Sequence, residues 1–249
     1  MFRRLGFVAF ALVLALVAST SFAATVEQVK ARGKLLVAVP NFETEPFMFK
    51  KEGKLVGFEV DLIEAIAKEL GVPYELVVLP WDGGIALAWD KAYGWDKFDM
   101  AVANITIKDA RAEVCDFSTP YFLTGQVIVF RKNAPIAKVE DILKKKVGVM
   151  SNSTGEEAAK NILKDVQIVG YPDANAMTEG LKKGEVDGAV IDETWAMTIV
   201  KTNPDLDYLK QLLTKERYGV AVKKGSDLKA LVDKVIEAKR DELSKKWLQ

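Results

Sequence analysis

Short apolar runs alternate with amphipathic segments along most of the 249-residue chain, and this alternation limits the possible folds more than any other sequence feature. The clearest helix ends before Gly71, because apolar residues from Ile63 to Leu70 recur at the spacing of one buried helix face. We expect Asp61 and Glu64 to cap its start. Strands that alternate with helices are typical of mostly parallel sheets flanked by helices, so the sequence predicts an α/β fold.

The other elements follow from the same periodicities. We predict strands at residues 35–39, 54–58, 74–79, 100–103, 127–131, 147–150, 167–170, 188–191 and 218–222. We predict helices at residues 25–32, 139–145, 154–164, 174–183 and 194–201, and a last helix from residue 227. The alternation breaks at residues 120–125 and 215–217, where we expect the chain to cross between two lobes.

The first 23 residues differ from the rest of the chain. Arg3 and Arg4 precede an apolar stretch from Phe7 to Val17, and small residues near Ala23 offer a cleavage site. This pattern is typical of a cleaved secretory signal peptide. The alternative is a membrane anchor, but the apolar run is shorter than the roughly 20 residues that span a bilayer. We predict a signal peptide at residues 1–23 and a soluble product in the periplasm.

One cysteine, Cys115, cannot form a disulfide within the chain. Its apolar neighbours indicate a small buried side chain, and a reactive thiol is the alternative. No cysteine stands at the predicted cleavage site, so the sequence does not support lipid attachment there.

The charges argue against several classes of function. The chain has 35 Lys and Arg, 35 Asp and Glu, and no histidine. Nucleic-acid binding needs clustered basic residues, so we expect no nucleic-acid partner. The lack of histidine removes the usual general base near neutral pH and the commonest zinc or copper ligand. We therefore expect no metal, no cofactor and no catalytic residue.

The segment 98–111 carries the first candidate binding residues. Its predicted strand is followed by Thr106 and then Arg111, which places a hydroxyl and a guanidinium near the carboxyl end of a sheet. Open α/β folds bind ligands at that edge. Arg111 is suited to hold a carboxylate through two parallel hydrogen bonds. The alternative is a surface arginine paired with Glu113 or Asp116.

The segment 147–159 runs from a strand through a small-residue loop into a helix. Backbone N–H groups at a helix start, with the hydroxyls of Ser153 and Thr154 beside them, suit an anionic group. The alternative is an ordinary helix cap, because Ser153 with Glu156, or Thr154 with Glu157, has the spacing of a capping box.

Asp192 follows directly on a strand and precedes a helix. It is placed either to accept hydrogen bonds from an ammonium group or to cap the helix. Taken with Arg111 and Thr106, it supplies one partner for each end of a zwitterion. An α-amino acid is the small molecule that carries both ends.

On these residues the chain resembles the periplasmic polar-amino-acid-binding proteins, which are the solute receptors of ABC importers. The similarity spans nearly the whole predicted mature chain and keeps the family's order. It is carried by the segments 57–62 (GFEVDL), 80–83 (PWDG), 105–111 (ITIKDAR), 117–121 (FSTPY), 147–149 (VGV), 153–156 (STGE), 187–189 (DGA) with Asp192, and 218–225 (YGVAVKKG).

The resemblance implies two lobes, each a mostly parallel sheet flanked by helices, joined by a two-strand hinge. Lobe 1 comprises residues 24–122 plus 218–249, and lobe 2 comprises residues 123–217. A bound amino acid would touch both lobes and favour their closed arrangement. The closed form would then dock on an ABC transporter permease in the membrane, and a soluble monomer suits that role.

By position in the family, Arg111 would bind the carboxylate of the ligand, and Ser153 and Thr154 would add to that site. Thr106 and Asp192 would bind the ammonium.

The positions around the ligand side chain depart from the family pattern. Trp81 stands where the family places an aromatic ring, with core packing as the alternative. Asn41, Thr44 and Asn104 replace, respectively, an aspartate of some relatives, an aromatic residue and a small residue, and they are assigned to the ligand pocket. Residues 88–97 contain about five extra residues, whose role is open. Four acidic residues are candidates for facing a cationic ligand side chain: Glu43, Glu45, Asp82 and Glu193.

An enzyme on the same scaffold is the main alternative, because cyclohexadienyl dehydratases resemble this family and act as lyases. Such a lyase needs an acid or base against the leaving group. Trp195 stands where those enzymes carry a glutamate, and no histidine is present to replace it. A third interpretation, the detached sensor domain of a signalling receptor, is disfavoured because no membrane or kinase segment follows.

Overall fold

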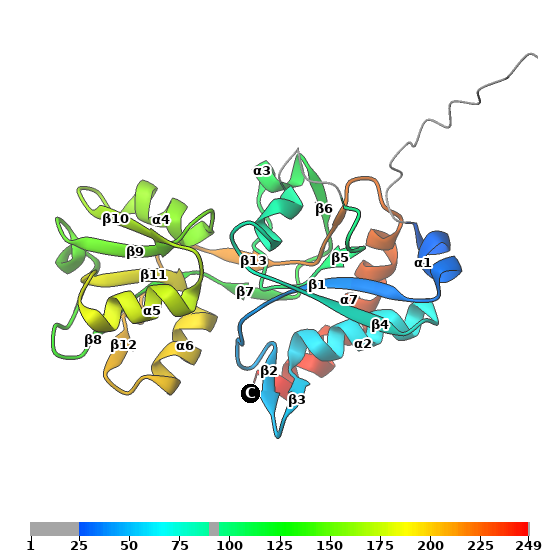
Figure 1. Cartoon of the computed structure of the whole chain (residues 1–249), viewed down its shortest axis with the longest axis horizontal. Coiled ribbons are helices and arrows are strands. Elements are labelled where there is room, and N and C mark those ends of the chain that lie inside the picture. Colours follow the sequence, from blue (N-terminus) through cyan, green and yellow to red (C-terminus); the bar gives the residue numbers. More distant parts are fainter. Residues whose placement is uncertain (1–24, 90–94, 249) are drawn as a thin grey trace, which may run out of the picture.

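The computed structural model describes residues 25–89 and 95–248. The predicted signal peptide, residues 1–23, and half of the inserted segment 88–97 lie outside the described residues. Two five-stranded sheets are joined by two extended crossings (Figure 1). Among the described helices, none combines the length and the apolar character needed to cross a membrane.

The first sheet has the strand order β4-β1-β5-β14-β6. Its strands are β1 (Leu35–Pro40), β4 (Tyr74–Leu79), β5 (Met100–Ala101), β6 (Cys115–Phe117) and β14 (Ala221–Lys223). The helices of this lobe are α1 (Val26–Arg32), α2 (Phe58–Leu70), α3 (Asp109–Ala112) and α7 (Leu228–Trp247), with a 3-10 turn at Ile85–Trp89. Helices α2 and α7 pack on each other, and β2 (Phe49–Lys51) and β3 (Lys54–Val56) form a separate hairpin.

The second sheet has the order β10-β9-β11-β8-β12. Its strands are β8 (Gln126–Arg131), β9 (Lys146–Met150), β10 (Gln167–Tyr171), β11 (Gly188–Asp192) and β12 (Leu206–Tyr208). The helices α4 (Thr154–Ile162), α5 (Ala174–Lys183) and α6 (Glu193–Thr202) pack on it.

The chain passes between the sheets twice. The crossings are β7 (Phe122–Thr124) and β13 (Glu216–Tyr218), which pair antiparallel to each other. Each crossing leads into the one strand that runs against the others in its sheet, β8 or β14. The reversal follows from the route, because a chain that arrives from the other lobe enters the sheet from the edge at which the parallel strands end. The prediction of mostly parallel sheets with a two-strand hinge is confirmed.

Several predicted elements are wrong in extent, among them the strand predicted at 100–103, which ends at Ala101, and the helix predicted at 154–164, which ends at Ile162. The strand predicted at 218–222 is divided, because Glu216–Tyr218 pairs with the other crossing whereas Ala221–Lys223 pairs inside the first sheet. The helix predicted at 139–145 is a 3-10 turn at Val139–Ile142, and Lys144 then takes a positive φ of 62°. The strand predicted at 54–58 ends at Val56, since Phe58 already begins α2.

The predicted cap of α2 is also wrong. The helix begins after Gly57, which has a φ of 133° and provides no side-chain cap. A Cβ on Gly57 would lie 2.2 Å from the carbonyl oxygen of Phe47, so only glycine fits this close approach. Asp61 instead accepts hydrogen bonds from Lys246 and Trp247 of α7. Thr25 and Gln28 form a capping box at the start of α1, and α2 ends before Gly71 as predicted, with Gly71 in the left-handed conformation.

Cys115 lies on β6 and is fully buried. Burial is the main cause that raises the pKa of its thiol to about 12, so the reactive thiolate is strongly disfavoured. The interpretation as a small buried side chain is confirmed.

Candidate functional site

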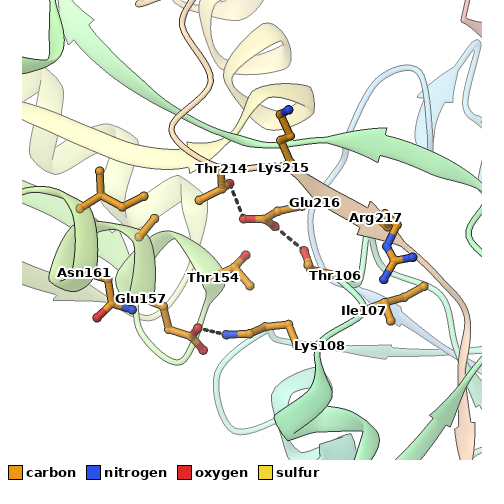
Figure 2. Close-up of a pocket in the computed structure, with 12 residues that line it drawn as sticks. Thr106, Ile107, Lys108, Thr154, Glu157, Asn161, Thr214, Lys215, Glu216 and Arg217 are labelled. Carbon is orange, nitrogen blue, oxygen red and sulfur yellow. Dashed lines mark hydrogen bonds and ion pairs between the residues drawn. The ribbon is translucent and has the colours of Figure 1, made fainter.

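Polar side chains from the two sheets meet where parallel strands end. Thr106 follows β5 of the first sheet, while Ser153 follows β9 and Asp192 ends β11 of the second sheet. This edge of an open α/β sheet is the usual place for a ligand. Lys108 and Glu157 form an ion pair from one lobe to the other (Figure 2). The edges at which the parallel strands of the two sheets end therefore face each other across one cleft.

Arg111 is held inside this cleft by the short helix α3. Its side chain is only 5% exposed, and one Nη atom donates to the carbonyl oxygen of Thr106 at 2.9 Å. Its guanidinium carbon lies 5.9 Å from the centre of the Trp81 ring. The predicted alternative of a surface arginine is wrong, and Asp116 pairs with Lys224 instead.

The charge of Arg111 is kept despite its burial. Desolvation lowers the pKa of the guanidinium to about 10, while the negative charges of Asp192 and Glu216 act in the opposite direction. Arg111 is therefore cationic at neutral pH. A buried cation of this kind is suited to receive a carboxylate.

Asp192 enters the cleft from the other lobe and is 7% exposed. Although it precedes α6, its side chain makes no capping hydrogen bond, so the interpretation as a cap is wrong. Its Oδ1 accepts a hydrogen bond from the hydroxyl of Tyr218 at 2.7 Å. Tyr218 belongs to β13, so the hinge itself supports this carboxylate.

Burial, and after it the charge of Glu216, raises the pKa of Asp192 to about 7. Hydrogen bonds from the side chains of Tyr218 and Gln126 act in the opposite direction. An ammonium group placed against Asp192 would favour its ionised form further.

Thr106 lies beside Glu216, a hinge residue that the sequence did not single out. The Thr106 hydroxyl donates to one carboxylate oxygen of Glu216 at 2.6 Å, and the Thr214 hydroxyl donates to the other at 2.7 Å (Figure 2). Since its proton is directed to Glu216, the oxygen of Thr106 presents lone pairs to other donors. This arrangement suits an ammonium group.

The start of α4 separates the roles predicted for its two hydroxyl residues. Ser153 is the N-cap: its oxygen accepts from the N–H of Glu156 at 3.2 Å, and its hydroxyl donates to Met150 at 2.7 Å. Thr154 is the first helical residue, and its oxygen accepts from the side chain of Gln126 at 3.1 Å. The capping alternative is therefore correct for Ser153. Because the oxygen of Thr154 accepts from Gln126, the hydroxyl hydrogen of Thr154 points to a different acceptor.

Asn104 is fixed by a buried network. It has a positive φ of 52°, and its side-chain oxygen accepts from the hydroxyl of Thr44 at 2.9 Å. Its backbone N–H donates to Glu59 at 2.8 Å, and Tyr121 donates a hydrogen bond to the same oxygen of Glu59. Thr44 and Asn104 thus contact each other, with exposures of 0% and 4%.

Glu59 gives this network a measurable pH dependence. Burial raises the pKa of Glu59 from 4.5 to about 7, while the bonds from Tyr121 and Asn104 lower it. A carboxyl whose pKa is higher in the folded than in the unfolded protein makes the fold more stable at low pH than at high pH. For Glu59 this difference develops as the pH rises from about 4.5 to about 7. Glu59→Gln is therefore expected to reduce the loss of unfolding free energy between pH 5 and pH 8, by about 3 kcal/mol at most.

Urea denaturation at both pH values measures this difference. The glutamine retains an acceptor for Tyr121 and Asn104, so its other effects on stability do not depend on pH. Glu64→Gln is the matched control, because Glu64 lies on the exposed face of the same helix. The same pH slope in wild type and Glu59→Gln would contradict the assignment.

The remaining predicted pocket residues differ in burial. Trp81 is 4% exposed and belongs to an apolar cluster with residues of both lobes, among them Phe42 and Trp195. It therefore lies both in the core and near Arg111. Asn41 is exposed, and the structure does not bring its side chain into the buried group.

The candidate acidic residues lie mainly at the rim of the cleft. Glu45 of lobe 1 pairs with Lys201 of lobe 2 at 2.7 Å, and Asp82 accepts from Asn152 across the cleft at 2.8 Å. Glu43 accepts from the backbone of Lys50 within lobe 1. Together with the Phe42 and Trp195 rings, whose centres are 3.7 Å apart, the Glu45–Lys201 and Asp82–Asn152 contacts hold the lobes in direct contact.

A cavity of about 290 Å³ remains between the lobes on the side of the hinge. It is bordered by Thr106 and Lys108 from the first lobe, Thr154 from the second, and Glu216 from the crossing (Figure 2). Within residues 25–89 and 95–248, no cluster of three or more Cys, Asp or Glu side chains is placed to hold a metal ion.

Comparison with known proteins gives the family. A family model described as bacterial extracellular solute-binding proteins, family 3, matches residues 36–249. The L-cystine-binding protein TcyJ of Escherichia coli K12 is 36% identical over 230 residues, which cover 88% of this chain and 84% of that protein.

Two solved structures agree in fold and sequence. The amino acid ABC transporter substrate-binding protein AbpA of Streptococcus pneumoniae, bound to L-arginine, has a TM-score of 0.77 and 34% identity, covering 88% of this chain and 94% of that one. The ancestral amino-acid-binding protein AncCDT-1, a precursor of cyclohexadienyl dehydratase, has a TM-score of 0.78 and 31% identity, covering 91% and 100%. The chain belongs to the bacterial extracellular solute-binding proteins of family 3.

Proposed function

We propose that this protein captures one free α-amino acid between its two lobes and delivers it to the permease of an ABC transporter. The observation that carries the proposal is the pair of buried, opposite charges in one cleft, Arg111 from lobe 1 and Asp192 from lobe 2. Each end of a zwitterion then meets a group of the opposite sign.

In this proposal Arg111 binds the carboxylate of the amino acid, and the Thr154 hydroxyl adds a hydrogen bond. Asp192 and the oxygen of Thr106 bind the ammonium. The network of Thr44 and Asn104 closes the pocket on the lobe 1 side, and Trp81 packs on the ligand side chain. Ser153 acts mainly by fixing the start of α4, and Asn41 lies at the rim.

The lobes are assigned as residues 24–122 plus 218–249 and residues 123–217. Both crossings, β7 and β13, lie at these boundaries. An amino acid that contacts both lobes stabilises the closed arrangement over an open one by its differential contacts. The ion pairs Lys108–Glu157 and Glu45–Lys201 link the lobes in the same closed arrangement.

The setting follows from the family and the leader-like first residues. We infer that a cleaved signal peptide directs the protein to the periplasm, where it acts as a monomer and meets its permease. Two of the relatives named above are an L-cystine-binding protein and a protein bound to L-arginine, which makes these two amino acids the first ligands to try.

We propose binding without catalysis. Trp195 occupies the position at which the similar lyases carry a glutamate, and it is 3% exposed against Phe42. An indole at this position has no proton to exchange with a leaving group near neutral pH.

Calorimetric titration tests the proposed function. The mature protein is unfolded and refolded to remove any carried-over ligand, and then titrated with the twenty amino acids, ornithine, citrulline and L-cystine. Micromolar or tighter binding of one or a few is expected. Absence of binding across the set, or loss of prephenate or arogenate during incubation, would overturn the proposal in favour of another ligand or the lyase.

A further inference from the structure

Gln126 occupies a junction between the hinge and the ligand-contacting residues of lobe 2. It is the first residue of β8, directly after the β7 crossing, and it is fully buried. Its backbone N–H donates to the Thr214 hydroxyl at 2.9 Å, and its carbonyl accepts from Leu213 at 2.7 Å. Gln126 is therefore held where the segment that enters lobe 2 meets the segment that leaves it.

The side chain of Gln126 reaches two residues of the cleft. In the antiparallel pair of β8 with β11, Gln126 stands directly opposite Asp192. Its Nε2 donates to the oxygen of Thr154 at 3.1 Å, and its side chain lowers the pKa of the Asp192 carboxyl on the facing strand. A primary amide carries two N–H bonds, so one nitrogen serves both neighbours.

The oxygen of the Gln126 amide points toward α4. The Oε1 atom of Gln126 has no hydrogen-bond partner among the described residues and faces Gly155. A Cβ at Gly155 would lie 3.0 Å from this oxygen and 2.7 Å from the carbonyl oxygen of Val190. A buried acceptor without a partner is unfavourable, so the contacts of the N–H groups have to outweigh this cost for the amide to keep this orientation.

We propose that Gln126 is a positioning residue, which turns the Thr154 hydroxyl toward a ligand carboxylate and holds Asp192 as the acceptor for a ligand ammonium. Because the oxygen of Thr154 accepts from Gln126, its own proton is directed to another acceptor. The N–H that points at Asp192 stabilises the ionised carboxylate. This inference rests on the proposed function and adds one residue that acts on both ends of the zwitterion.

The charges around Asp192 determine what the loss of Gln126 would do. Glu216 of the hinge raises the pKa of Asp192, and Tyr218 lowers it through a hydrogen bond. Arg111 of α3 adds an attractive positive charge. Without the Gln126 bond, we expect the pKa of Asp192 to rise above about 7, so that the carboxylate is protonated over a wider pH range.

The test compares wild type with Gln126→Met, which keeps the length of the side chain and removes both N–H donors. L-cystine and L-arginine are the first probes, followed by the tightest-binding amino acid of the calorimetric set. Affinity is measured from about pH 6 to about pH 8.5. The variant is expected to bind at least tenfold more weakly at pH 7 and to recover part of this loss at the alkaline end.

A purely structural role of Gln126 gives a different pH profile, in which affinity falls by the same factor at every pH. Gln167→Met is the matched control, since Gln167 is an exposed residue at the start of β10. If the methionine variant does not fold, the smaller Gln126→Asn is used, and the same pH-linked loss is expected.

Unchanged affinity, a loss independent of pH, or failure of both variants to fold would overturn the proposal for Gln126. Failure of the wild-type protein to bind any amino acid would instead overturn the proposed function.

Discussion

Arg111→Met is expected to weaken binding of the captured amino acid by about 2–5 kcal/mol, the scale of removing one partner of a buried charged pair. The guanidinium is 5% exposed and is fixed by the carbonyl oxygen of Thr106, so its loss leaves the ligand carboxylate without its cationic partner. Methionine fills much of the same volume against Trp81 and keeps the apolar contacts of the arginine stem.

Calorimetric titration of the folded variant measures this loss, and circular dichroism verifies the fold. Arg240→Met on α7 is the control, because Arg240 is exposed and is not one of the residues that border the cleft. A dissociation constant equal to that of wild type would remove Arg111 from the binding site.

Asp192→Asn is the second substitution with a large expected effect, about 2–5 kcal/mol for an amino acid. The asparagine preserves the shape of the side chain but removes the negative charge that we propose faces the ligand ammonium. An analogue of the same amino acid that lacks the amino group is expected to lose little, since it makes no ionic contact with Asp192.

The comparison of the amino acid with its analogue separates a lost contact to the ammonium from a general loss of protein stability. Both are titrated against wild type, Asp192→Asn and the control Asp205→Asn, which changes an exposed carboxylate in the same lobe. Equal losses for the amino acid and its analogue would contradict direct contact between Asp192 and the ammonium.

The fold was largely predictable because its long elements carry strong periodicity. The spacing from Ile63 to Leu70 and the apolar run of β8 both indicate buried faces. Strands of three residues, such as β6, β7 and β12, are too short to show a period. The reversed directions of β8 and β14 depend on where the chain crosses between lobes, which local patterns do not encode.

The grouping of the candidate site was predictable where a residue stands at the end of a strand. Thr106, Thr154 and Asp192 are brought together in this way, and Arg111 joins them from the adjacent helix. Gln126 and Glu216 were missed because their partners are distant in sequence: Gln126 bonds Thr154, 28 residues away, and Glu216 bonds Thr106, 110 residues away.

The same reason explains Glu59, whose burial depends on Asn104 and Tyr121. A carboxylate on an amphipathic helix is normally exposed, so the sequence alone gave no sign of its place in the core. The exposure of Asn41 and the capping role of Ser153 likewise depend on how the loops pack.

A crystal structure of the refolded protein with its tightest-binding amino acid tests the central claim most directly. We expect the ligand between the lobes, its carboxylate on Arg111 and Thr154 and its ammonium on Asp192 and Thr106. Density for the amino acid outside the cleft, or in the cleft without contact to both Arg111 and Asp192, would contradict the claim.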